Sequence, residues 1–268
     1  MRPQDIKIGT SGWRFEDWAG TFYPLRVPQT KWLEYYAARF PVGEINSTYY
    51  RIPPARSFET INAKTPDDFK IFAKVHGDVT HARKEVADSM QRLLASLMPL
   101  RESKKLIGLL AQFPTNFHFN SESVRYLENL CALCTGIALC VEFRHNSWDR
   151  DDAGEQIRSA GLTWVSVDEP TLDGLMSPRV RVTSDIAYVR LHGRNAAAWY
   201  NRSAGNRYDY DYSGQELEEW GEKLLTGATP ARRAFVLFNN CYHGQAPRNA
   251  QWLMKWMEQK RIAGETET

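Results

Sequence analysis

Eight short apolar runs along this chain each end in a polar or charged residue. The runs cover residues 6–9, 42–45, 69–73, 106–111, 138–143, 162–167, 187–191 and 234–238. The polar residues that follow them are Thr10, Asn46, Lys74, Gln112, Arg144, Asp168, His192 and Asn239. Helix-like stretches separate most runs, which is the alternation of a parallel β/α fold. We therefore expect a single (β/α)8 barrel of the TIM type, with its ligand site at the carboxyl ends of the strands.

The length of the chain fits one barrel and no second domain. A barrel of this type takes about 250 residues, and the chain has 268. We expect one domain over residues 1–264 and a disordered tail over residues 265–268. Two prolines and a glycine between residues 170 and 181 predict an irregular crossover in place of the sixth helix.

The composition of the chain favours one cellular compartment, the cytoplasm. The chain is 43% hydrophobic and 25% charged, which is ordinary for a globular protein, and no run approaches the roughly 18 apolar residues of a membrane span. The first residues, MRPQD, lack an apolar signal segment. Four unevenly spaced cysteines do not form a disulfide framework. These features indicate a cytoplasmic protein without a membrane partner, and a net charge of +2 neither requires nor excludes nucleic acid.

Several polar side chains on neighbouring strands should converge at the barrel mouth, because residues two apart on a strand share a face. We expect Glu142, Asp168 and His192 to supply acid/base chemistry, joined with Arg144 and Arg190 in one polar network. Two alternatives stay open. The same three groups could hold a divalent metal, or the arginines could simply neutralise the carboxylates in a buried ion-pair network.

The arginines favour an anionic ligand over a metal, because a guanidinium binds phosphate or carboxylate with two hydrogen bonds. We therefore assign no metal ligands and no definite cofactor. Lys74 is expected to contact the anion, although a barrel lysine could also form a Schiff base. The residues expected to contact the ligand are Glu44, Asn46, Lys74, His81, Gln112, Arg144, Arg190, Arg194, Tyr200, Asn239 and Asn240.

Two long connections, residues 11–30 and 194–213, are rich in aromatic residues and should leave the same end of the barrel. Long loops often carry function. The second connection places Tyr200 and other aromatic rings beside arginines. Such rings can stack on bases or sugars, or they can pack the loop against itself.

The chain resembles the YecE-like family, a microbial family catalogued as a domain of unknown function. The resemblance covers nearly the whole chain and rests on short motifs in a fixed order. They are GTSGW (9–13), FYP (22–24), EINSTYYR (44–51), FAK (72–74), TH (80–81), QFP (112–114), EFRH (142–145), SW (147–148), RLHGR (190–194), YDY (208–210) and FNN (238–240). The resemblance implies a β/α barrel with its site at the mouth, and it implies no particular reaction.

Three functions fit these observations. The leading hypothesis is an enzyme, hydrolase-like or lyase-like, that acts by acid/base chemistry on a phosphorylated or nucleotide-like small anion. The second is a metal-assisted phosphodiesterase or endonuclease acting on nucleic acid. The third is a non-catalytic module that binds a nucleotide or regulates a partner.

Overall fold

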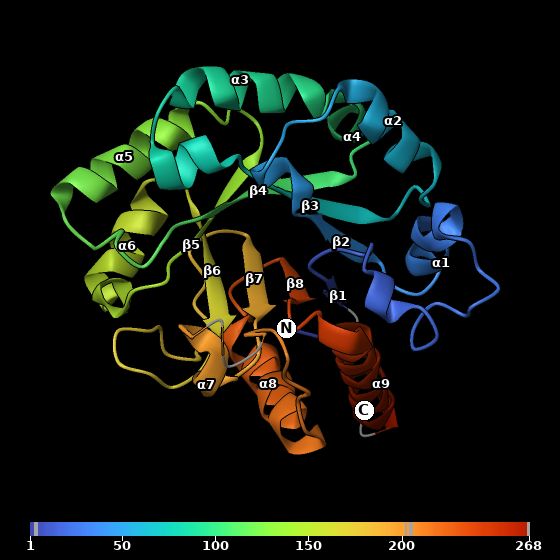
Figure 1. The fold of residues 1–268 in the computed structure, drawn as a ribbon. Coiled ribbons are helices and arrows are strands. Elements are labelled where there is room, and N and C mark those ends of the chain that lie inside the picture. The colour runs from blue at the N-terminus through green and yellow to red at the C-terminus, as the bar shows by residue number, and fades with distance from the viewer. Residues whose placement is uncertain (3–4, 202, 204–205, 267–268) are drawn as a thin grey trace.

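The barrel predicted from the apolar runs is present. The structure is a computed structural model that describes residues 1–2, 5–201, 203 and 206–266. Eight parallel strands close in chain order, with β8 paired to β1, and helices surround them (Figure 1). The strands are β1 (Ile6–Thr10), β2 (Val42–Ile45), β3 (Lys70–Lys74), β4 (Leu106–Gln112), β5 (Ala138–Glu142), β6 (Thr163–Asp168), β7 (Ile186–Leu191) and β8 (Arg233–Phe238).

The helices follow the strands as expected, with one exception. They are α1 (Trp32–Ala37), α2 (Ala55–Ala63), α3 (Val86–Ser96), α4 (Met98–Glu102), α5 (Ser121–Ala132), α6 (Asp151–Ser159), α7 (Ala196–Trp199), α8 (Gly214–Gly227) and α9 (Gln245–Thr266). The crossover from β6 to β7, residues 169–185, contains no helix, as its prolines indicated. Of the tail expected to be disordered, residues 265–266 belong to α9 and residues 267–268 lie outside the described part of the chain.

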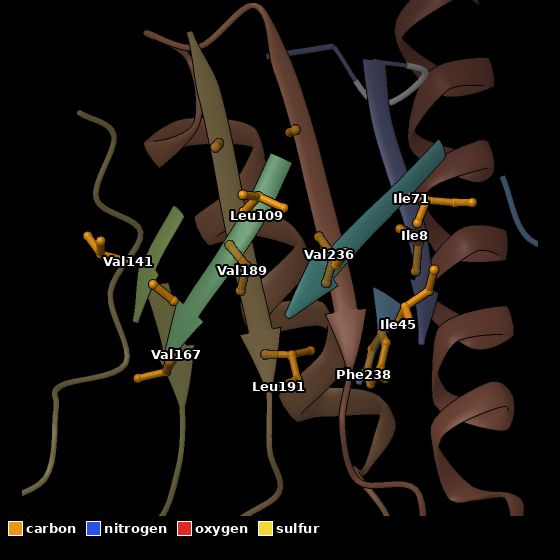
Figure 2. Packing of buried hydrophobic residues seen from close by; sticks show 14 of the residues in the cluster. Ile8, Ile45, Ile71, Leu109, Val141, Val167, Val189, Leu191, Val236 and Phe238 are labelled. Atoms are coloured by element: carbon orange, nitrogen blue, oxygen red, sulfur yellow. The ribbon is translucent and has the colours of Figure 1, made fainter. Parts of the chain in front are cut away.

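Alternation along the strands produces two apolar cores. The larger core lies between the strands and the helices. Figure 2 shows part of it, with Val189 and Leu191 on β7 and Val236 and Phe238 on β8. The smaller core fills the barrel interior and consists of Val42, Phe72, Leu110, Cys140, Val165, Ile186, Tyr188, Phe235 and Leu237.

A polar layer covers the inner core at the carboxyl ends of the strands. The residues that stand two positions after Val42, Phe72, Leu110, Cys140 and Tyr188 are Glu44, Lys74, Gln112, Glu142 and Arg190. Because side chains two apart share a face, each of these polar residues lies above an apolar residue of the inner core. The period-2 pattern of the sequence therefore builds the floor of the barrel mouth.

The first aromatic loop packs against the body of the protein. Tyr23 stacks on Trp32 with ring centroids 4.5 Å apart and planes 2° apart. Trp18 is fully buried, and its indole Nε1 donates a 2.7 Å hydrogen bond to the carbonyl of Cys241. The packing alternative therefore holds for these rings. Within the described residues, no helix is both long and apolar enough to span a membrane.

Candidate functional site at the barrel mouth

Two adjoining cavities open above the polar layer. The larger measures about 560 Å³, within the usual range of small-molecule sites, and its lining includes Lys74, His81, Gln112, Arg144 and Tyr200. The smaller measures about 260 Å³ and is lined in part by Asn46, Arg190 and Asn239. Both cavities share Tyr49, Tyr50, Lys74, Gln112 and Tyr208. Eight of the residues expected to contact a ligand therefore border one open space.

Arg190 on β7 joins several strands inside the barrel. Its Nη1 donates to Glu142 Oε2 and its Nη2 to Glu44 Oε1, each over 2.6 Å. Nη2 also lies 3.3 Å from Ser11 Oγ, and Tyr188 donates its hydroxyl to the other oxygen of Glu44. Both carboxylates are fully buried. The guanidinium of Arg190 is thus bound by carboxylates of the protein itself, which leaves it little capacity for a ligand anion.

Arg144, just after β5, forms a second centre. Its Nη2 lies 2.6 Å from Glu142 Oε1, and its Nη1 donates over 3.0 Å to Glu169 Oε2. His192 Nε2 lies 3.3 Å from the same Glu142 oxygen. Burial by itself raises the pKa of Glu142, but Arg144 and Arg190 outweigh that effect and hold its pKa well below the usual range. Glu142 is therefore a permanent carboxylate at neutral pH.

His192 is a neutral ring in this setting. It is fully buried, and burial together with Arg144 lowers its pKa to about 3. Asn239 Nδ2 lies 2.9 Å from its Nδ1, and Arg144 Nη2 lies 3.1 Å from its Nε2. The acid/base role expected for His192 stays a prediction, and it would involve the neutral imidazole rather than the imidazolium.

Glu169 is a charged group of the mouth that was not among the residues predicted from the sequence, and Arg207 at the rim is another. Glu169 continues the face of Val165, which packs in the inner core, and its side chain meets Arg144. Its other oxygen accepts a 3.0 Å hydrogen bond from the amide of Met176. Burial raises the pKa of Glu169 to about 7, although Arg144 opposes the rise. The alternation of β6 was the signal that could have identified it, because Glu169 is four residues after Val165.

Asp168 lies in a different cluster from Glu142, so the expectation of one network that includes it is wrong. Asp168 pairs in register with Leu191, which packs in the outer core. Arg194 binds its carboxylate through Nε at 2.9 Å and Nη2 at 3.0 Å, and the Tyr212 hydroxyl donates over 2.6 Å. One residue's difference along a strand reverses the face. Asp168 therefore points toward the helix layer.

Arg194 and Asn240, both expected to contact a ligand, also serve this outer cluster. Arg194 Nη1 donates over 2.8 Å to Glu216 Oε1, close to the start of α8. The Asn240 amide donates to the Tyr210 carbonyl at 2.8 Å and to Asn249 Oδ1 at 2.7 Å. Neither residue lines the two cavities. The structure gives them contacts that fix the loop between β7 and α8 against α9.

Lys74, at the end of β3, differs from Arg144 and Arg190 in its hydrogen-bond partners. Its Nζ donates over 2.8 Å to Gln112 Oε1 and lies 4.7 Å from the ring centroid of Tyr49. Burial, assisted by the positive charge of Arg190, lowers the pKa of Lys74 to about 8. Arg207, at the rim, contacts the rings of Trp199 and Tyr208. In the part of the chain that the structure describes, neither cation forms an ion pair with a carboxylate.

Exposed aromatic rings frame the larger cavity. Tyr50 is 80% exposed and Tyr200 is 63% exposed, although both line it. Tyr49 meets Tyr50 edge to face at 5.0 Å and His81 at 5.1 Å. An exposed ring beside a cavity offers a flat apolar surface to a ligand. Unlike the first loop, this side of the mouth keeps aromatic surface open.

The donor set does not suit a divalent metal. Over residues 1–2, 5–201, 203 and 206–266, no group of three or more His, Cys, Asp and Glu side chains is arranged to hold a metal ion. The carboxylates that a metal would need at the mouth, Glu44 and Glu142, are bound by guanidinium groups. A cation placed there would have to displace them against charge repulsion.

These features define a single (β/α)8 barrel whose interior is filled by side chains and whose mouth holds a polar cavity large enough for a small ligand. The chain belongs to the family described as "Protein of unknown function DUF72", whose family model matches residues 7–268. The match confirms that the chain belongs to a family of unknown function, as the resemblance of its motifs predicted.

Relatives from three bacteria support the assignment over most of their lengths. UPF0759 protein YunF of Bacillus subtilis (strain 168) is 32% identical over 270 residues, which is 94% of this chain and 95% of the relative. The crystal structure of a DUF72 family protein from Thermotoga maritima has a TM-score of 0.87 and 41% identity, covering 94% of this chain and 99% of that one. A DUF72 family protein from Enterococcus faecalis has a TM-score of 0.84 and 27% identity, covering 94% and 95%.

Proposed function

We propose that this protein is an enzyme that binds a phosphorylated or nucleotide-like small anion in the barrel mouth and acts on it by acid/base chemistry. One observation carries the proposal. Lys74 and Arg207 border the same 560 Å³ cavity, and within the described chain neither is neutralised by a carboxylate. Unpaired cations beside a cavity favour an anionic ligand, because a charge-assisted contact replaces hydration of both partners.

The aromatic rim supports a ligand with a flat group. Tyr50 and Tyr200 expose most of their surface beside the two cations. Stacking on such rings contributes roughly 1–3 kcal/mol per base in nucleic-acid complexes. A nucleotide combines an anionic phosphate with a planar base, so it matches both features of the lining.

The acid/base roles follow from which groups change protonation near neutral pH. Lys74, with a pKa of about 8, and Glu169, with a pKa of about 7, both do so. General acid/base catalysis works best when the pKa of the group lies close to the working pH. In this proposal Glu142 and His192 hold Arg144 in place, and Lys74 is the group nearest to the ligand that can exchange a proton.

Titration calorimetry with AMP and inorganic pyrophosphate tests the binding step. Lys74→Ala should weaken the affinity by roughly 10–100-fold, because one charge-assisted contact contributes about 1.5–3 kcal/mol. Lys70→Ala is the matched control, since Lys70 begins the strand that Lys74 ends and donates to the Lys104 carbonyl. Equal affinity in the two variants would contradict the anion site.

Catalysis needs a separate measurement. The protein is incubated with a mixture of nucleotides and sugar phosphates, and mass spectrometry follows the loss of each compound. Consumption by the wild type but not by Lys74→Ala supports an enzyme. Binding of AMP without consumption of any compound would instead favour the non-catalytic nucleotide-binding module.

A further inference from the structure

Lys74 combines two features that an anion contact alone does not require. It projects from the end of β3 above the buried Phe72, so its amine reaches the junction of both cavities. Its protein hydrogen-bond partner is the neutral Gln112 amide oxygen. A simple anion contact would be served equally well by a fully exposed, permanently charged lysine.

The charged groups that face Lys74 come from three strands and a turn. Arg190 on β7 and Arg144 after β5 disfavour its charged form, and Glu44 on β2 and Glu142 on β5 favour it. Both glutamates are already bound by guanidinium groups. His81, in the turn after β3, has its pKa lowered by burial and by Lys74. Burial therefore decides the balance, and a large fraction of the amine is neutral near pH 8.

We propose that Lys74 is a nucleophile that forms an imine with a small anionic aldehyde or ketone bound in the barrel mouth. This inference rests on the proposed function, since it assigns the substrate class of the same site. A half-buried amine held beside a cavity, next to other cations and without a carboxylate partner, is the arrangement that activates a lysine toward carbonyl carbon.

The step balances without a further reagent. The neutral Nζ of Lys74 adds to the carbonyl carbon and forms a C–N bond, giving a carbinolamine. In the carbinolamine one proton has moved from the nitrogen to the former carbonyl oxygen. The hydroxyl then takes up a proton from solvent and leaves as water with cleavage of the C–O bond, the nitrogen loses its one remaining proton to solvent, and a C=N bond remains. Gln112 Oε1, 2.8 Å from Nζ, can hold the amine in place during the addition. Arg207, which lines the same cavity, can hold the anionic group of the substrate.

Reductive trapping with pyridoxal 5′-phosphate, used as an anionic aldehyde probe, tests the inference. The folded protein is treated with less than one equivalent at pH 8, reduced with borohydride, digested and mapped by mass spectrometry. We expect the adduct on Lys74 to exceed that on the exposed Lys31 by roughly tenfold, because far more of the Lys74 amine is neutral at this pH. Labelling spread over many lysines without preference for Lys74 would overturn the proposal.

Matched variants and a competitor make the outcome specific. Lys74→Arg keeps a positive charge and should abolish the preferred adduct, whereas Lys70→Arg should leave it unchanged; equal circular dichroism spectra and melting temperatures establish that both variants fold. Preferred labelling of Lys74 without protection by AMP would support the imine and contradict the proposed anion site. Tight AMP binding without preferred labelling would contradict the imine and leave the anion site supported.

Discussion

At the scale of single residues, the mouth contains two kinds of charged side chain. Arg190 and Arg144 are buried and bound by carboxylates, and removal of one partner would leave an uncompensated buried charge. Lys74 and Arg207 border open space without such partners in the described chain. Conformational stability and ligand binding therefore depend on different residues, although both sets lie within one mouth.

Glu169 should give stability an unusual pH dependence. Its folded pKa of about 7 lies above the ordinary value of about 4.3, so the folded chain binds more protons than the unfolded chain between these values. The contribution of Glu169 to stability is therefore complete below about pH 4 and is lost as the pH rises through 7. The effect amounts to roughly 2–4 kcal/mol.

The comparison of wild type with Glu169→Gln isolates this effect. The variant keeps a neutral side chain, so the stability of the wild type relative to the variant should fall between pH 4.5 and 7 in urea unfolding. His192, with its lowered pKa, changes stability in the opposite direction over pH 3–6.5. That change occurs in both proteins and cancels in the difference. A difference that stays constant or grows with pH would contradict the assignment.

At the scale of elements, the connection from β7 to α8 depends on a tight turn after His192. Gly193 has a φ of +88°, and its amide donates to the Tyr212 hydroxyl at 2.9 Å. A Cβ at this position would lie 2.7 Å from Tyr210 Cβ. The turn brings Arg194 onto Asp168, which anchors the connection to the end of β6. The contacts among Asp168, Arg194 and Tyr212 therefore hold the connection from β7 to α8 against the end of β6.

Gly193→Ala should destabilise the protein more than Gly161→Ala. Both glycines have positive φ, at +88° and +71°, and that conformation is less favourable for an alanine by about 1–2 kcal/mol. A Cβ at Gly161 would meet nothing within 4 Å, so the control variant carries the backbone cost alone. Gly193→Ala should lose roughly 1–3 kcal/mol more through the clash. Equal urea midpoints for the two variants would show that the loop relaxes freely.

At the scale of the whole molecule, Arg190 ties opposite sides of the barrel together. It binds Glu44 on β2 and Glu142 on β5 from its own place on β7. The apolar inner core below it holds the strands by packing, and this ion-pair layer closes the interior at the mouth. Buried ion pairs therefore connect β2, β5 and β7 across the interior, in addition to the backbone pairing of β8 with β1 that closes the barrel.

Arg190→Ala should lower the melting temperature strongly. Loss of one partner from a buried ion-pair network costs about 3–5 kcal/mol, which corresponds to roughly 6–20 °C for a protein of this size. Arg233→Ala is the control, because Arg233 forms an exposed pair with Asp185 and such pairs contribute at most about 1 kcal/mol. Melting temperatures that agree between the two variants would rule out this structural role for Arg190.

Sequence periodicity determined the architecture of this protein. Alternating strands and helices indicated the parallel barrel. Of the polar residues that end the apolar runs, Asn46, Lys74, Gln112, Arg144 and Asn239 line the cavities at the mouth, whereas Asp168 points toward the helix layer. The spacing of Glu142 with Arg144, and of Arg190 with His192, correctly predicted that these four residues are connected. Asp168, which was expected in the same network, lies outside it. These features are local, because a period of two along a strand fixes which side chains share a face.

Only the tertiary structure decided which charges are paired and which are free. Asp168 and Glu169 are adjacent in the sequence, yet one binds Arg194 in the outer layer and the other binds Arg144 at the mouth. Likewise, Lys74 lacks a carboxylate partner in the described chain because the glutamates near it are already bound by Arg190. Which charges pair depends on the distances between side chains on strands that are far apart in the chain. Neither the composition nor the spacing of residues along the sequence determines those distances.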